Sequence, residues 1–151
     1  MARSYGLLHV NLNVSDLSRS VRFYTQALGI TVVSEAEETV DFGAGPELLH
    51  QVILTVPQTC TLLVLTAAPS LPVGPGGLNH VGLVLDSDEG VTEMAQRVTA
   101  LGGAVHKQGR REGARVAEAF AYVRDPDGYA IELSTQAILC AQCADGSAHS
   151  G

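Results

Sequence analysis

The sequence predicts an α+β fold made of two tandem βαβββ modules, which form a curved mixed sheet around a metal-containing cavity. A strand followed by a helix that ends in Leu-Gly occurs twice, once from His9 to Gly29 and once from His80 to Gly102. Further stretches with strand-like patterning follow each copy. Because each helix must cover the apolar face of its strands, the opposite polar faces are left to line a cavity.

The first copy shows the pattern most clearly. Residues 7–14 alternate apolar and polar side chains, as a strand with one buried face does. Asp16 is the predicted N-cap of the helix, and Gly29 can end it in a left-handed conformation. Its remaining strands are expected at about 30–34, 51–56 and 60–66, with a loop from Asp41 to Glu47.

The second copy repeats this order after a stretch rich in Pro and Gly. Its expected elements are a strand at 79–85, a helix at 88–101, a strand near 103–107, a basic loop from Lys107 to Arg115, a strand at 117–124, a turn at 125–128 and a strand at 129–135. We expect a single domain over residues 1–139, with module one at about 6–68, a linker at 69–77, module two at 78–136 and a flexible tail at 140–151.

Composition excludes several classes of protein. The 151 residues are 46% hydrophobic and 17% charged, which suits a compact domain. The formal net charge of −7 argues against a nucleic-acid binder, and no apolar run is long enough for a membrane span. The N-terminus lacks a signal-peptide core, and three cysteines fit a reducing cytoplasm. Cys140 and Cys143 have C-x-x-C spacing, as incidental thiols, a redox pair or a weak metal clip would.

His9, His80 and Glu132 form the predicted metal site. The two histidines occupy the same position in the two copies, and Glu132 lies in the last strand. Its neighbours Ile131 and Leu133 are apolar, so Glu132 faces the cavity with the histidines. Two histidines and one carboxylate are the ligand set of a metal site with open positions. The alternative is a metal-free binder that keeps these residues as relics.

Other polar residues have two interpretations each. Tyr122 is an ordinary strand aromatic, or it lies beside the metal and hydrogen-bonds substrate. Asn11 and Asn13 face solvent, or they bind substrate next to His9. The basic residues Lys107, Arg110, Arg111 and Arg115 form a solvated loop, or an anion clamp in which Arg115 contacts substrate.

Three segments carry a family resemblance. They are the Leu8-His9-Val-Asn-Leu opening with its Phe23-Tyr24 and Leu28-Gly29 helix, the Asn79-His80-Val-Gly-Leu opening, and the Asp125-Pro-Asp-Gly-Tyr-Ala-Ile-Glu132-Leu ending. Together they resemble the vicinal oxygen chelate superfamily, which holds glyoxalase I, fosfomycin-resistance thiol transferases, bleomycin-binding proteins and extradiol dioxygenases. The resemblance implies that His9, His80 and Glu132 bind a divalent ion, and that two copies pair as a homodimer, with the modules joined within one chain or across chains.

Two departures bear on the reaction. The chain resembles glyoxalase I in these three ligands. Glyoxalase I has a fourth ligand, usually Glu, at the position that Val64 occupies here. Extradiol enzymes have Tyr-x-x-Asp-Pro-x-Gly-x-x-x-Glu, which residues 122–132 match, but the histidine that precedes it is replaced by Gly113, Ala114 and Arg115. His50 and His106 are the remaining acid–base candidates beside Tyr122.

The resemblance leaves three classes of function. The first is an Fe(II) extradiol-type dioxygenase that cleaves a ring of a small molecule with vicinal oxygens. The second is a glyoxalase-like lyase or isomerase, or a thiol transferase, using Mn, Ni, Zn or Co. The third is a non-catalytic antibiotic-binding resistance protein. The Tyr122 motif and Val64 put the dioxygenase first, with Fe(II) as the favoured cofactor and no nucleic-acid or membrane partner.

Overall fold

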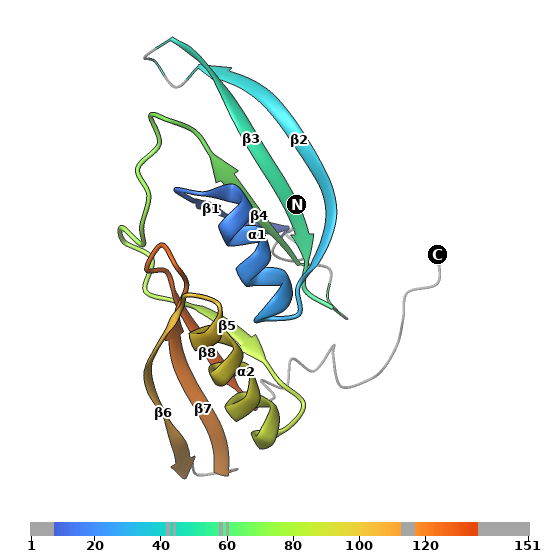
Figure 1. The fold of residues 1–151 in the computed structure, drawn as a ribbon, viewed down its shortest axis with the longest axis vertical. Helices are drawn as coiled ribbons and strands as arrows, with labels where there is room; N and C mark the ends of the chain where they lie inside the picture. Colours follow the sequence, from blue (N-terminus) through green and yellow to red (C-terminus); the bar gives the residue numbers. More distant parts are fainter. Residues whose placement is uncertain are drawn as a thin grey trace, which may run out of the picture.

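The computed structural model describes residues 8–41, 43, 45–57, 59, 61–112 and 117–135. It confirms the predicted fold, since two four-stranded mixed sheets each carry one helix (Figure 1). The first module comprises β1 (His9–Asn13), α1 (Leu17–Gln26), β2 (Thr31–Asp41), β3 (Pro46–Thr55) and β4 (Leu62–Ala67). The second comprises β5 (Val81–Val84), α2 (Asp88–Ala100), β6 (Ala104–Glu112), β7 (Ala117–Arg124) and β8 (Ala130–Ser134).

The two sheets have the same topology. Their strand orders are β1-β4-β3-β2 and β5-β8-β7-β6, and in each sheet only the first pair is parallel. A parallel pair requires a crossover, and in each module the helix lies within that connection. The internal repeat in the sequence is therefore a repeat of topology, and equivalent residues occupy equivalent places in the two sheets.

α1 begins at the predicted cap, Asp16, and α2 begins at a cap of the same kind, Ser87. The Asp16 carboxylate accepts a hydrogen bond from the Arg19 backbone N–H at 2.9 Å, and Ser87 Oγ accepts one from Gly90 at 3.0 Å. These bonds satisfy backbone donors that the first helical turn leaves unpaired. Each helix buries one face against its sheet, with Phe23 in α1 and Val98 in α2 fully buried.

The modules lie end to end along the long axis, with both helices on the same side (Figure 1). A single core of buried apolar side chains runs through both of them. The turn between β7 and β8 locks this arrangement, because Asp127 accepts hydrogen bonds from the side chains of Ser15, Arg19 and Ser20. Gly103 also meets module one closely, since a Cβ there would lie 2.8 Å from Phe23.

Two parts of the chain differ from the sequence prediction. β2 runs to Asp41 and β3 begins at Pro46, so the hairpin is longer than expected and the loop shorter. The prediction of a basic loop from Lys107 is wrong for residues 107–112, because β6 continues to Glu112. Edge strands with exposed polar side chains lack the apolar alternation that predicts a strand. Backbone hydrogen bonds to the neighbouring strand hold them in the sheet.

Candidate metal centre

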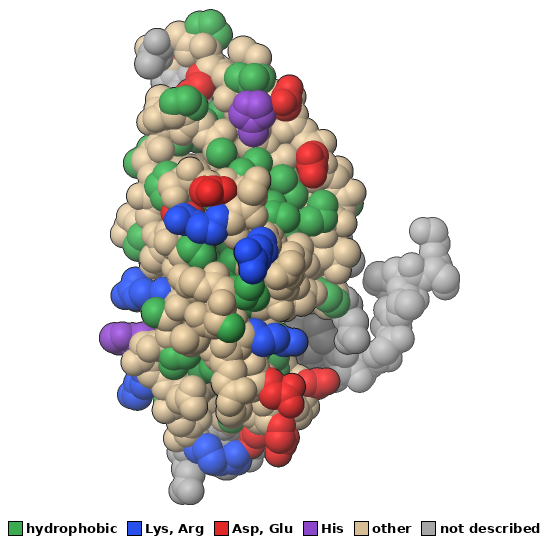
Figure 2. All heavy atoms as spheres, in the orientation of Figure 1, with side chains coloured by type: hydrophobic (Ala, Val, Ile, Leu, Met, Phe, Trp, Pro, Cys, Tyr) green, Lys and Arg blue, Asp and Glu red, His purple; other side chains and the backbone are tan. Residues whose placement is uncertain are grey.

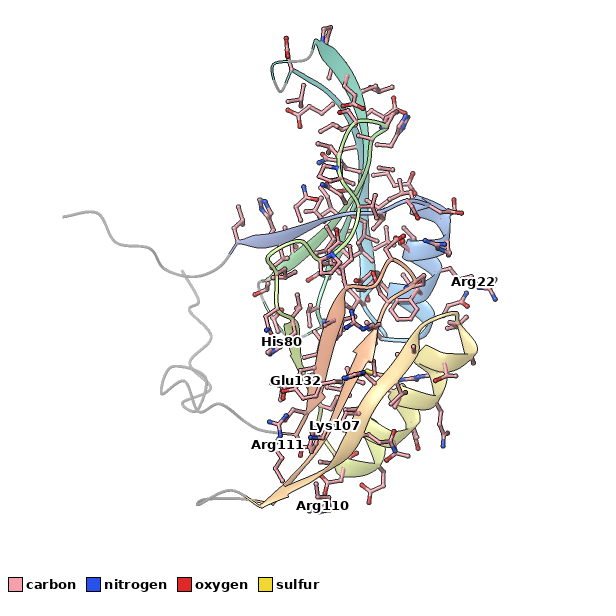
Figure 3. The ribbon with its side chains drawn as sticks, turned by 90° about the vertical axis from the view of Figure 1, so that its left-hand side faces the viewer. Arg22, His80, Lys107, Arg110, Arg111 and Glu132 are labelled. Carbon is pink, nitrogen blue, oxygen red and sulfur yellow. The ribbon has the colours of Figure 1, made fainter. Side chains whose placement is uncertain are left out.

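His80 and Glu132 lie together on the sheet face opposite α2. His80 immediately precedes β5, and Glu132 is in the middle of β8, where it pairs in parallel register with Gly82. This register brings His80 Nε2 to 3.1 Å from Glu132 Oε2. The two side chains are 34% and 17% exposed, so their approach is partly shielded from water. Figure 3 shows His80 and Glu132 projecting on the same side of the sheet.

A contact with Asn79 orients the ring of His80. Its Nδ1 lies 2.6 Å from Asn79 Oδ1, which can only accept a hydrogen bond. Nδ1 therefore carries a proton, and the lone pair of a neutral ring is on Nε2, which faces Glu132. This 3.1 Å separation suits an ion pair or two ligands of one metal ion. Neutral histidines that bind metals are oriented by such bonds.

Arg111 of β6 contacts the other oxygen of this carboxylate. Arg111 Nη2 donates to Glu132 Oε1 at 2.6 Å and to the Tyr122 hydroxyl oxygen at 2.9 Å. The guanidinium also stacks on Phe120, with Cζ 4.2 Å from the ring centroid. Tyr122 in turn meets the His80 ring edge to face at 5.7 Å. Arg111, Tyr122, His80 and Glu132 thus form one connected polar group on the face of the second sheet opposite α2.

The charges in this group favour ionised Glu132. Partial burial raises the pKa of its carboxyl, but the hydrogen bonds from Arg111 and Tyr122 and the charges of Arg111 and His80 outweigh burial and lower that pKa below its usual value. The bond to Glu132 in the same way raises the pKa of Arg111. Glu132 is therefore an anion with one oxygen held by Arg111 and one directed at His80.

His9 and Val64 occupy the equivalent places in module one. In β1–β4, Asn11 pairs with Val64, two residues after His9, and in β5–β8, Gly82 pairs with Glu132, two residues after His80. Val64 therefore stands where the repeat places a carboxylate, as the sequence suggested. His9 does not join His80 and Glu132, since no group of three or more His, Cys, Asp or Glu that could hold a metal occurs among the residues that the structure describes.

Residues 6–133 match the Glyoxalase/Bleomycin resistance protein/Dioxygenase superfamily. The chain belongs to this superfamily. A lactoylglutathione lyase from Salmonella typhimurium is 34% identical over 134 residues, which cover 84% of this chain and 90% of that protein. A probable chloroplastic lactoylglutathione lyase from Arabidopsis thaliana is 33% identical over 134 residues, which cover 84% of this chain but 35% of the plant protein.

Two solved structures share the fold. A glyoxalase family protein from Bacillus cereus superposes with a TM-score of 0.72 at 16% identity, covering 88% of this chain and 95% of that one. The fosfomycin resistance protein FosX from Mesorhizobium loti superposes with a TM-score of 0.64 at 22% identity, covering 94% and 99%. At these identities the likeness is one of fold.

Module one of this superfamily member carries a second polar group. Thr66 Oγ1 donates to Asn11 Oδ1 at 2.8 Å and accepts from Gln51 Nε2 at 3.2 Å. These bonds place Asn11 and Thr66 on one face of the sheet, which in β1 is also the face of His9 and Asn13. Asn13 Nδ2 donates to the Pro72 carbonyl at 3.1 Å, so it helps to hold the connection between the modules.

The two histidines expected to act as acid–base groups lie elsewhere. His50 is exposed on β3 and pairs with Glu37, 3.0 Å away, in a shallow depression that Leu17 of α1 also lines. It therefore faces the helix side of the sheet, opposite to the polar face. His106 is the unpaired residue of a bulge in β6 and is exposed. Neither histidine contacts His80 or Glu132 in the described interactions, so the sequence interpretation of both as catalytic finds no support in their positions.

Arg111 contacts Glu132 in a way that the sequence does not predict. The sequence predicts one basic loop, whereas β6 separates Lys107, Arg110 and Arg111 by face. Lys107 and Arg111 lie on the side of Phe120 and Tyr122, while Arg110 pairs with Asp88 on the other side (Figure 3). Alternation over Lys107, Gly109 and Arg111 is the signal that could have shown this. Arg115, expected to contact substrate, lies outside the described residues.

Proposed function

We propose that this chain is a divalent-metal-dependent, glyoxalase-like lyase or isomerase that acts on an adduct of a thiol and a 2-oxoaldehyde. The relatives named lactoylglutathione lyase support this class over the extradiol dioxygenase and its Fe(II), which the sequence placed first. The His80–Glu132 pair carries the proposal, because it holds an imidazole nitrogen and a carboxylate oxygen 3.1 Å apart on one face of the sheet, as two ligands of one ion would lie. The substrate's vicinal oxygens would meet the ion at its open positions.

The residues present fit a divalent ion. His80 offers an imidazole nitrogen, and Glu132 offers a carboxylate oxygen 3.1 Å from it. A nitrogen and an oxygen ligand of this kind suit Zn, Ni, Co or Mn. We propose His9 of a second copy as the third ligand, since His9 is separate from the pair within one chain. The protein would then act as a homodimer whose sites form across chains.

When bound, the ion would act as a Lewis acid and stabilise negative charge on the substrate oxygens. The chain's own groups then have defined tasks. Tyr122 accepts a hydrogen bond from Arg111, so its own proton is available for Glu132 or for a substrate oxygen. Glu132 Oε2 can hold a proton that leaves a substrate carbon. No second carboxylate supports this step, because Val64 occupies the equivalent position in module one.

Partner classes follow from the same observations. Neither helix in the described residues is long and apolar enough to cross a membrane. On the face seen in Figure 2, Lys and Arg side chains are dispersed among Asp and Glu and form no single basic patch. The relatives named lactoylglutathione lyase support a small molecule as the substrate.

The test combines metal analysis with turnover. Protein purified without chelator should contain Ni, Zn, Co or Mn, and the loaded protein should convert a mixture of methylglyoxal and glutathione into a thioester, followed by its ultraviolet absorbance. Glu132→Ala should lose both metal and activity. If the loaded protein instead consumes oxygen with catechols and forms no thioester, the lyase proposal is wrong and the dioxygenase stands.

A further inference from the structure

Arg111 is placed where it competes with a metal ion for Glu132. Its Nη2 holds Glu132 Oε1 at 2.6 Å, while Glu132 Oε2 lies 3.1 Å from His80 Nε2. The two oxygens of the carboxylate therefore have different partners. One accepts a hydrogen bond from Arg111, and the other faces His80, the proposed metal ligand. A free carboxylate can bind an ion through both oxygens, and a carboxylate held in this way has one oxygen left.

The position of Arg111 is built into the sheet. Phe120 lies under its guanidinium at 4.2 Å, and Tyr122 accepts a second hydrogen bond from the same nitrogen. Planar guanidinium groups make such stacked and bonded contacts well, and an ammonium group would keep the charge but lose the stacking. The side chain is 37% exposed, so its charge is only partly screened by water.

We propose that Arg111 is a positioning residue that restricts Glu132 to binding the metal through one oxygen, which keeps a coordination position open for substrate and weakens metal binding. This inference rests on the proposed function, because it requires a divalent ion on His80 and Glu132. The weakening follows from charge, since a guanidinium on a ligand carboxylate repels a second cation on the same carboxylate. The role differs from that of Asn79, whose neutral bond to His80 favours metal binding.

A supporting role and a competing role for Arg111 predict opposite changes in metal affinity when this residue is replaced. If it only supported the shape of the site, its loss would weaken metal binding, as loss of an orienting partner typically does by about 10–100-fold. If it competes as proposed, Arg111→Gln should bind Zn(II) and Co(II) about tenfold more tightly, since glutamine keeps a donor without the charge. Arg111→Lys should bind as weakly as the parent, because it retains the charge.

Arg110→Gln is the matched control. Arg110 is adjacent and carries the same charge, but it pairs with Asp88 on the opposite face of β6 (Figure 3). Metal affinity would be measured by competition with a chromophoric chelator, and coordination by the visible spectrum of the Co(II) protein. We expect Arg111→Gln alone to change the spectrum toward higher coordination number, with Arg110→Gln like the parent in both readouts. Circular dichroism of each metal-free variant checks that it folds.

The outcomes separate this inference from the proposed function. Weaker or unchanged affinity of Arg111→Gln, with an unaltered Co(II) spectrum, would overturn the role of Arg111 and leave the lyase proposal intact. Tighter binding with an altered spectrum supports the inference even if the protein forms no thioester from methylglyoxal and glutathione. If the parent protein binds neither Zn(II) nor Co(II), both proposals fall.

Discussion

Val64 is a single side chain on which the proposed metal chemistry depends. It is buried on the same face as Asn11 and Thr66, in the place that the repeat gives to a carboxylate. A valine there leaves three protein ligands at the proposed centre rather than four. The position thus offers a direct way to alter the ligand set without touching His9, His80 or Glu132.

Val64→Glu should add the fourth ligand. The metal-free variant should be less stable than the parent, because it places an unpaired carboxylate at a buried position. Zn(II) or Ni(II) should bind at least about tenfold more tightly, equivalent to about 1.4 kcal/mol, and should raise the melting temperature more than in the parent. Val64→Gln is the uncharged control. If Val64→Glu binds metal no more tightly than Val64→Gln, position 64 does not adjoin the ion.

Residues of the site differ in how far the sequence reveals them. His80 and Glu132 could be named because the repeat marks the first and apolar neighbours give the second its register. Arg111 could not be assigned a role, because its contacts depend on how β6 pairs with β7 across a bulge at His106. Whether His9 reaches the other ligands also depends on the pairing of chains, which periodicity does not encode.

Among the elements, the β7–β8 turn contributes most to joining the modules. Asp125 is buried, and its carboxylate accepts hydrogen bonds from the backbone N–H groups of Asp127 and Tyr129 and from the Tyr24 hydroxyl of α1. The sequence predicted the turn from Asp-Pro-Asp-Gly, but not its bonds to module one, since those require the packing of distant segments.

Asp125→Ala should destabilise the fold by about 3 kcal/mol, because it leaves three donors without their acceptor. The free energy of unfolding would be measured by urea titration. Glu93→Ala, on the exposed side of α2, is a suitable control and should change the same free energy by less than about 0.5 kcal/mol. If the two variants change the free energy of unfolding equally, water replaces the Asp125 carboxylate as acceptor without loss of stability.

The Tyr24–Asp125 bond also predicts alkaline sensitivity. Burial, together with the charge and hydrogen bond of Asp125, raises the pKa of Tyr24 well above its usual value. The folded protein therefore holds this proton more tightly than the unfolded chain, and stability falls as pH rises above the unfolded value of about 10. Tyr24→Phe should be less stable near pH 8 but lose less stability between about pH 8 and 11. The urea midpoints of the parent and of Tyr24→Phe would be measured across this pH range. An equal fall in both midpoints would show that Tyr24 does not cause the loss of stability.

At the scale of the whole molecule, the end-to-end modules keep the two halves of the proposed site apart. The Asp127 contacts to Ser15 and Arg19 and the shared core fix module one against module two. Within the described residues, His9 thus remains separate from His80 and Glu132. Two copies related by a two-fold axis can bring module one of each chain onto module two of the other, since isologous pairing repeats every contact.

Mixing two inactive variants tests this assembly. His9→Ala and Glu132→Ala should each lose metal binding and activity as pure proteins. A hybrid dimer that contains one chain of each keeps, in one of its two sites, an unaltered His9 from one chain and unaltered His80 and Glu132 from the other. Hybrid dimers isolated with two affinity tags should therefore regain metal and about half the parent's activity, because one site per dimer is intact. If all three ligands came from one chain, every site in the hybrid would still lack a ligand, and neither metal nor activity would return.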